Sequence, residues 1–229
     1  MIVIDGNIGA GKTTQLDLLE KKGFRVRREP LDQWPLKEFY EDPSRWAFFF
    51  HMVLLKTQKP PSSSRVIYER SLFSSRYVFW EVLLEQETVT QKEDEIYEYF
   101  WNKFAWKPKL FIYLSKDPEL AFEHIQKRNQ AGDTGITLEY LKLLDQKYKK
   151  LLMCIPCRVV VVNANKSAEE IHEEIYKHVL EYELMHGTYS GREEMQEDSG
   201  PGREVSCTSL QHMCSVSWAD QAVRQEIKV

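Results

Sequence analysis

The chain has 229 residues, of which 42% are hydrophobic and 29% charged, and its formal net charge is −4. This length predicts one sizeable core and a tail. Since the 31 basic and 35 acidic residues are spread along the chain, no overall positive field is present to attract a nucleic-acid polymer. No run approaches the roughly eighteen apolar residues of a membrane span, and no leader is recognisable before the first strand, so we expect a cytoplasmic protein without a membrane partner.

Short runs rich in β-branched and aromatic residues alternate with amphipathic segments along the first three quarters of the chain. These runs predict strands at 2–5, 24–29, 65–69, 109–114 and 158–163. Helices are predicted at about 12–22, 43–59, 71–86, 91–105, 117–129, 137–152 and 167–184. The alternation indicates an α/β fold in which a five-stranded parallel sheet is flanked by helices on both faces.

Three segments lack this patterning. Residues 59–65 form a Pro/Ser connector and 131–135 a glycine-flanked polar loop, and both are predicted to be mobile, as ligand-covering loops in such folds often are. Residues 187–229 hold few large apolar side chains and much Gly, Ser and Glu. Such a segment buries too little surface to offset its ordering entropy, so we expect a folded domain over 1–186 and a disordered tail after it.

The first predicted turn carries the pattern G-x-x-x-x-G-K-[ST], which spans Gly6–Thr13 as GNIGAGKT between a strand and a helix. Glycines let a backbone approach a polyphosphate closely, and the N–H groups of the loop and of the following helix N-terminus bind anions. Lys12 is expected to reach the β and γ phosphates, and the Thr13 hydroxyl to bind Mg²⁺. The predicted ATP-binding residues here are Gly6, Asn7, Ile8, Gly9, Ala10, Gly11, Lys12, Thr13 and Thr14.

Charged residues follow the second and third predicted strands. Glu29 opens the run EPLDQW, and Glu69 and Arg70 open ERSLFSSRYVF. Because ligands bind outside the carboxyl ends of parallel strands, we expect these three side chains to converge near the bound phosphates.

The runs GNIGAGKTT (6–14), EPLDQW (29–34), YEDPSRWAFFFH (40–51) and ERSLFSSRYVF (69–79) resemble those of the deoxynucleoside kinase family. The resemblance extends from the first residue to about residue 184. It implies a P-loop kinase in which Glu29 accepts the proton of the sugar 5′-hydroxyl, Arg70 contacts the 5′-oxygen and the transferring phosphate, and Glu69 helps to hold Mg²⁺.

The same resemblance implies a nucleoside pocket and an oligomeric state. Trp34, Phe50 and Phe79 match the aromatic walls of the family's base pocket, and Tyr40 matches the tyrosine that hydrogen-bonds the sugar 3′-hydroxyl. Family members are also homodimers, which predicts pairing through the helices at 43–59 and 71–86.

Two positions depart from the family pattern. His51 stands where the family has a glutamine whose flat amide pairs with the base edge, so bidentate reading of the base is lost. The lid, at about 127–135, has fewer arginines than usual. Arg128 is expected to clamp the phosphates, and Asp133 to replace the glutamate that binds the 3′-hydroxyl.

Together these features predict ATP-dependent phosphorylation of a deoxynucleoside at its 5′-hydroxyl, with thymidine or deoxycytidine as the expected type of acceptor. Two alternatives remain open. A thymidylate kinase shares the fold, but it carries further arginines for the acceptor's own phosphate and typically DRY in place of ERS. A nucleotide-binding module that has lost catalysis would also be consistent with the altered lid and with His51.

Overall fold

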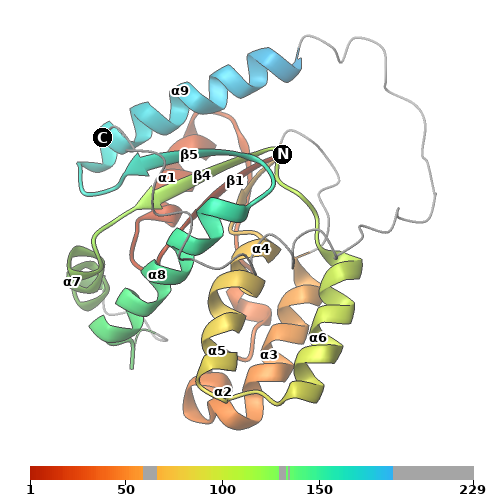
Figure 1. Ribbon diagram of the computed structural model, residues 1–229. Coiled ribbons are helices and arrows are strands. Elements are labelled where there is room, and N and C mark those ends of the chain that lie inside the picture. Colours follow the sequence, from red (N-terminus) through yellow and green to blue (C-terminus); the bar gives the residue numbers. More distant parts are fainter. Residues whose placement is uncertain (59–65, 129–132, 134, 188–229) are drawn as a thin grey trace, which may run out of the picture. The chain divides into compact units, whose positions relative to one another are not determined.

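In the computed structural model, five parallel strands form one sheet within the described residues, which are 1–58, 66–128, 133 and 135–187 (Figure 1). The chain divides into two units, Met1–Ser199 and Gly200–Val229, and the description concerns the first. The strand order is β2-β3-β1-β4-β5. The strands are β1 Ile2–Gly6, β2 Arg25–Arg27, β3 Val66–Glu69, β4 Leu110–Ser115 and β5 Arg158–Asn163.

Helices connect the strands and cover both faces of the sheet. In the described part of the chain they are α1 Lys12–Lys21, α2 Leu36–Glu41, α3 Pro43–Thr57, α4 Leu72–Ser74, α5 Glu81–Glu85, α6 Gln91–Phe104, α7 Pro118–Arg128, α8 Leu138–Cys154 and α9 Ala168–Gly187. A 3₁₀ turn lies at Leu31–Gln33, and a π-helical turn at Ser75–Trp80 joins α4 to α5. None of these helices combines the length and apolar character that crossing a membrane requires.

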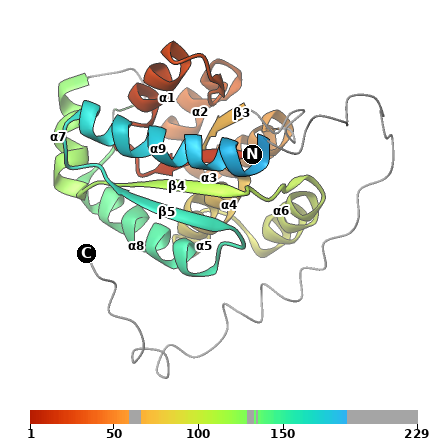
Figure 2. The same cartoon turned by 90° about the horizontal axis from the view of Figure 1, so that it is seen from above.

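Side-chain alternation along β1 divides the core into two layers. Ile2 and Ile4 pack with α1 and α9 on one face, whereas Val3 belongs to the cluster formed with α3, α5 and α8 on the other. Figures 1 and 2 show α9 and α8 on opposite sides of β4 and β5. With both faces covered, the carboxyl ends of the strands are the part of the sheet left open to a ligand.

Local capping fixes where the site-bearing helices begin. The Asp42 carboxylate accepts a hydrogen bond from the Arg45 amide at 3.2 Å, and Pro43 occupies the first turn of α3. The Thr137 hydroxyl accepts from the Tyr140 amide at 3.1 Å at the start of α8. These caps fix where α3 and α8 begin, and both helices contribute side chains to the cavity described below.

The strand predictions are confirmed for all five strands, with β2 shorter than expected. β2 is an edge strand whose Arg25 and Arg27 are exposed, and pairing ends before Pro30, which has no amide hydrogen to donate. Helix α2, at Leu36–Glu41, was not predicted. The predicted helix 71–86 is helical but is not one regular helix, since the π turn interrupts it. Such turns are frequent at functional sites.

The boundary expected between domain and tail also shifts. α9 continues to Gly187, so this residue is helical and not part of the tail. The rest of the predicted tail, the connector 59–65, and most of the loop 131–135 lie outside the described residues.

Candidate active site

A cavity of about 260 Å³ opens at the carboxyl ends of β1, β2 and β3. It brings together side chains from the first turn, the second and third strands, α2, α3 and the lid. The predicted site residues that line it are Ile8, Gly9, Gly11, Lys12, Thr13, Thr14, Glu29, Trp34, Tyr40, Phe50, His51, Glu69, Arg70, Phe79, Arg128 and Asp133. Gly6, Asn7 and Ala10 do not line it, since they lie in the buried base of the first turn.

The first turn has the backbone that its glycines predict. Gly9 has a φ of +79°, and a Cβ at this position would lie 2.6 Å from the carbonyl oxygen of Ala121 in α7. The side-chain Nδ2 of Asn7 donates to the backbone carbonyl oxygen of Leu141 at 2.8 Å, which connects the turn to α8. The loop is therefore held against two helices, and only glycine fits at position 9.

Lys12 lies along the inside of this turn. Its Nζ donates to the carbonyl oxygens of Gly6 at 3.1 Å and Asn7 at 2.9 Å. Burial, together with the neighbouring Arg70 charge, lowers the pKa of Lys12 to about 8. A cation that is held by carbonyl oxygens in an anion-binding turn is well placed to exchange them for phosphate oxygens.

Arg70 is the centre of the polar network. Its φ of +60° is uncommon for a residue with a side chain, which marks local strain of the kind found at functional sites. Its Nε lies 3.1 and 3.2 Å from the two carboxylate oxygens of Glu29, and its Nη1 donates to the Gly6 carbonyl oxygen at 3.1 Å. The guanidinium carbon lies 4.8 Å from the centre of the Phe79 ring.

Glu29 pairs with this guanidinium and is only 12% exposed. Burial raises the pKa of Glu29 to about 7, although Arg70 opposes the shift. A carboxylate with a pKa near neutrality changes its protonation state readily at physiological pH. Glu29 thus combines an ion pair with Arg70 and a pKa near neutrality, which are properties that a proton acceptor needs.

Thr13 and Glu69 are the oxygen ligands predicted for a metal ion. The Thr13 hydroxyl donates to a Glu69 carboxylate oxygen at 3.3 Å, so both lie at one point of the cavity. No group of three or more His, Cys, Asp or Glu side chains suited to a metal ion occurs among the described residues. One hydroxyl and one carboxylate fit Mg²⁺, because this ion takes few protein ligands and completes its shell with water and phosphate oxygens.

Trp34, Phe39 and Phe50 form an aromatic wall of the cavity. The Trp34 and Phe50 rings meet edge to face with centroids 5.7 Å apart, and Phe39 stacks on Phe50 at 4.8 Å. The Trp34 indole nitrogen donates to the Thr57 hydroxyl at 2.9 Å. The wall is thus fixed by ring packing and one hydrogen bond, and its surface suits a flat, apolar ligand face.

His51 also lines the cavity, next to Phe50, and is 2% exposed. Its ring meets Trp80 and Tyr97 edge to face at 5.1 and 5.7 Å. Burial first, and the Arg76 charge second, lower the pKa of His51 to about 3, so the imidazole is neutral at physiological pH. Its Nδ1 is buried and has no hydrogen-bond partner among the described residues.

The lid residues meet at the other side of the cavity. Arg128 Nε and Nη2 each donate to a different carboxylate oxygen of Asp133 at 2.7 Å, which is a bidentate ion pair. Both side chains line the cavity. In this structure Arg128 is thus paired with Asp133.

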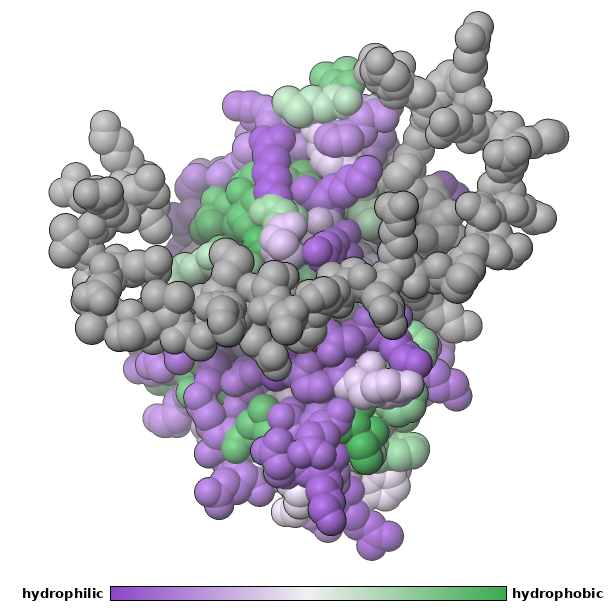
Figure 3. All heavy atoms as spheres, turned by 45° about the vertical axis from the view of Figure 1, so that its right-hand side comes forward, coloured by the Kyte–Doolittle hydropathy of each residue, from purple (hydrophilic) through white to green (hydrophobic). Residues whose placement is uncertain are grey.

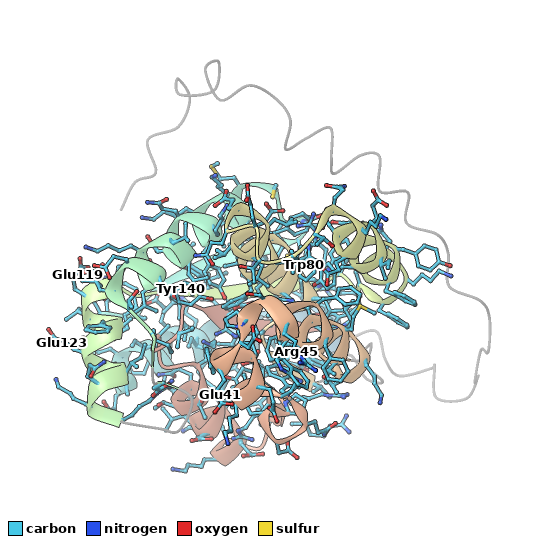
Figure 4. The ribbon with its side chains drawn as sticks, turned by 90° about the horizontal axis from the view of Figure 1, so that it is seen from below. Glu41, Arg45, Trp80, Glu119, Glu123 and Tyr140 are labelled. Atoms are coloured by element: carbon cyan, nitrogen blue, oxygen red, sulfur yellow. The ribbon has the colours of Figure 1, made fainter. Side chains whose placement is uncertain are left out.

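Several lining residues were missed by the sequence analysis. Figure 4 shows Tyr140 of α8 nearer the centre of the view than Glu119 and Glu123, which lie along α7 at its edge. Tyr140 could have been found from its position in the first turn of α8, the helix that begins after the Thr137 cap and follows the lid. Asp5, which adjoins the site without lining it, could have been found from its position at the end of the first strand. The other missed lining residues are Leu31, Leu36, Phe39, Leu54, Ser75, Leu83 and Ile136.

Comparison with known proteins places the chain among nucleoside kinases. The family model described as deoxynucleoside kinase matches residues 2–184. "Putative kinase protein 029R" of Invertebrate iridescent virus 3 is 36% identical over 177 residues, which cover 74% of this chain and 90% of the relative. Deoxycytidine kinase 2 of Gallus gallus is 30% identical over 227 residues and covers 76% of this chain and 86% of the relative.

Solved structures agree on the fold. The structure of deoxyadenosine kinase from M. mycoides, with products dCMP and a flexible dCDP bound, superposes with a TM-score of 0.71. The two chains are 23% identical, and the match covers 80% of this chain and 100% of the other.

Proposed function

The chain belongs to the deoxynucleoside kinase family and is an ATP-dependent deoxynucleoside kinase, and we propose that Glu29 and Arg70 carry out the transfer in the cavity between them and the aromatic wall. The observation that carries this proposal is the Glu29–Arg70 ion pair at the mouth of the phosphate-binding turn. It supplies a proton acceptor and a fixed cation at one place, which is what phosphoryl transfer to a hydroxyl requires.

ATP is proposed to bind with its phosphates along the first turn. Gly9 and Gly11 have left-handed backbone angles that turn loop amides toward the ligand. Lys12 would release the carbonyl oxygens of Gly6 and Asn7 and bind the β and γ phosphates instead. Asn7 and Ala10 keep the loop in shape from its buried side, while Ile8 lines the cavity.

Glu29 is proposed to accept the proton of the 5′-hydroxyl as that oxygen attacks the γ-phosphorus. Arg70 then binds the attacking oxygen and the transferring phosphoryl group with the part of its guanidinium that faces the cavity. In a loose transition state, this positioning and charge stabilisation are most of what a protein contributes. The buried pair keeps the two groups in place before the substrate arrives.

Mg²⁺ is the proposed metal cofactor, held by the Thr13 hydroxyl and the Glu69 carboxylate. Their shared position in the cavity supports this assignment. When bound, the ion neutralises charge on the phosphate oxygens.

The acceptor is proposed to be a pyrimidine deoxynucleoside, thymidine or deoxycytidine, that lies between Trp34, Phe50 and Phe79. Phe50 and His51 both line the cavity with their ring centroids 5.3 Å apart, and such bulky side chains favour a small base. Neutral His51 has one donor and one acceptor on separate ring edges and would make a single contact to that base.

The sugar is proposed to lie toward the lid. Burial raises the pKa of Tyr40 above its ordinary value, so its hydroxyl stays protonated and can donate to the 3′-oxygen. Asp133 would accept from the 3′-hydroxyl while Arg128 holds it. Arg128 is also proposed to reach the donor phosphates.

A homodimer is proposed to form through α3 and α6. The segment 72–85 turns most of its large apolar residues into the core, so it presents little surface for pairing. Phe49 of α3 and Tyr99 of α6 are 52% and 56% exposed, and Ile96 and Phe104 of α6 are also exposed. Figure 3 shows small hydrophobic clusters on a mostly hydrophilic face. Light scattering on the wild type and on Tyr99→Glu tests this proposal. A wild type that is already monomeric would contradict the dimer.

The cytoplasmic location stays a prediction from the sequence.

The proposed function is tested by product formation from labelled ATP with thymidine, deoxycytidine, deoxyguanosine, deoxyadenosine and thymidine monophosphate as separate acceptors. We expect phosphorylated product from a pyrimidine deoxynucleoside. Activity on thymidine monophosphate alone would reassign the protein as a thymidylate kinase. ATP binding without product from any acceptor would identify an inactive nucleotide-binding module.

A further inference from the structure

Tyr148 of α8 is a fully buried residue directly behind the active-site cavity. Its ring centroid lies 5.2 Å from that of Tyr113 and 6.4 Å from that of Phe79, and the Tyr148 and Phe79 rings meet edge to face. Its hydroxyl donates to Asp5 Oδ1 at 2.8 Å and accepts a hydrogen bond from Arg70 Nη1. The hydroxyl therefore bridges a carboxylate at the end of β1 to the guanidinium proposed to contact the transferring phosphoryl group.

The direct contact between the two charged groups is weaker than the bridge. Arg70 Nη1 lies 3.4 Å from Asp5 Oδ1, which is longer than a good charged hydrogen bond. Asp5 Oδ1 also accepts from the Gly6 amide at 2.8 Å, so it is fully engaged, while Oδ2 is buried without a partner among the described residues. Tyr148 is thus the group that separates Asp5 from Arg70 at a set spacing.

Arg70 lies between two carboxylates that pull it in different directions. Glu29 holds its Nε, and Asp5 lies on the side of Nη1. Among the described residues, the hydrogen bonds of the Arg70 side chain come from Nε and Nη1. Nη2 is therefore the nitrogen that can bind a ligand in the cavity. Without the Tyr148 hydroxyl, the guanidinium would move toward Asp5 and turn away from Glu29 and from the reacting oxygen.

We propose that Tyr148 is a positioning residue for phosphoryl transfer, because its hydroxyl bridges Asp5 and Arg70 and so sets the direction of the Arg70 guanidinium. The inference rests on the role proposed for Arg70. Tyr148 itself does not line the cavity, and it acts through Arg70. The orientation of the Arg70 guanidinium matters in the transition state, where the phosphoryl group lies between the attacking 5′-oxygen and the leaving oxygen of ATP.

The test is Tyr148→Phe, which keeps the ring packing and removes only the hydroxyl. We expect kcat to fall about tenfold, as for the loss of one hydrogen bond to a charged group, with KM for ATP and for the deoxynucleoside unchanged. The matched control is Tyr113→Phe, because the Tyr113 hydroxyl is also buried but has no partner among the described residues. Its kcat should equal that of the wild type. Wild-type kcat in Tyr148→Phe, or an equal loss in both variants, would overturn the inference.

A double-mutant cycle with Arg70→Lys shows whether Tyr148 acts through Arg70. If it does, adding Tyr148→Phe to Arg70→Lys lowers kcat by less than about twofold further, whereas independent effects would multiply. A multiplicative result contradicts the inference but leaves the proposed function intact. Wild-type activity in Arg70→Lys alone would contradict both.

Thermal unfolding of each variant is measured alongside. Should Tyr148→Phe fail to fold, Asp5→Asn replaces it, because it weakens the same bridge while keeping the shape of the side chain. The inference is supported if Asp5→Asn lowers kcat and if its effect does not multiply with that of Arg70→Lys in the double variant. An unchanged kcat in Asp5→Asn overturns it.

Discussion

The side of the cavity proposed to bind phosphates (the phosphate side) and the side proposed to bind the nucleoside (the nucleoside side) are built by different means. On the phosphate side, Lys12, Glu29 and Arg70 follow strands or the first turn, and charged hydrogen bonds to named atoms hold them. On the nucleoside side, Trp34 comes from the turn before α2 and Phe50 from α3, and ring packing holds them. The polar side tolerates little change because each atom has a set partner, whereas the aromatic side can be repacked. Substitutions should therefore affect rate on one side and choice of substrate on the other.

The sharpest test of this contrast is Glu29→Gln. The amide keeps the shape of the side chain but cannot accept the hydroxyl proton, so we expect kcat to fall about a thousandfold. ATP binding should be unchanged, as followed by isothermal titration. Glu38→Gln on the exposed side of α2 is the matched control. A Glu29→Gln enzyme within tenfold of the wild type would assign the proton acceptor to another group.

The pH dependence of kcat/KM gives the second test. Glu29 must be ionised to accept a proton, and its pKa is raised to about 7, so kcat/KM should rise with pH, about tenfold per unit, until pH 7. Lys12 must be charged to bind phosphate, and its pKa is lowered to about 8, so kcat/KM should fall again above pH 8. Initial rates from pH 5.5 to 9.5 measure both limbs. An acid limb that persists in Glu29→Gln would belong to another group.

A smaller effect is expected for Gly9→Ala. The added Cβ would meet the Ala121 carbonyl oxygen at 2.6 Å, and the φ of +79° disfavours a side chain. We expect KM for ATP to rise about tenfold, because the loop must shift away from α7. Gly11→Ala is the comparison, since φ there is +93° but nothing lies within 4 Å of an added Cβ. Equal losses in both variants would show that backbone strain alone, and not the contact with α7, is responsible.

The smallest effect tests the nucleoside side. In His51→Gln a flat amide replaces a neutral imidazole, so the ratio of kcat/KM between deoxynucleosides should change by about fivefold while kcat with the best acceptor stays near the wild-type value. Rates with the four deoxynucleosides measure this. A fall in kcat with unchanged preference would mean that His51 supports the fold and does not read the base.

The grouping of Lys12, Glu29 and Arg70 in one cavity could be predicted from the sequence, because it depends on residue types at short spacings and at strand ends. The pattern Gly6–Thr13 needs glycines, a lysine and a hydroxyl within one turn, and strand ends bring Glu29 and Arg70 to the same edge of a parallel sheet. The alternation of strands and helices was likewise visible, because both faces of the sheet must be apolar.

Tertiary structure alone decided how those residues are paired. That Tyr148, 143 residues beyond Asp5, places a hydroxyl between Asp5 and Arg70 depends on how α8 packs across the sheet. The neutral state of His51 and the raised pKa of Glu29 likewise depend on burial by segments distant in the chain. Residue types and spacing determined what chemistry is present, and packing between distant segments determined which atoms meet and how they ionise, because desolvation and hydrogen bonding act only after the chain has folded.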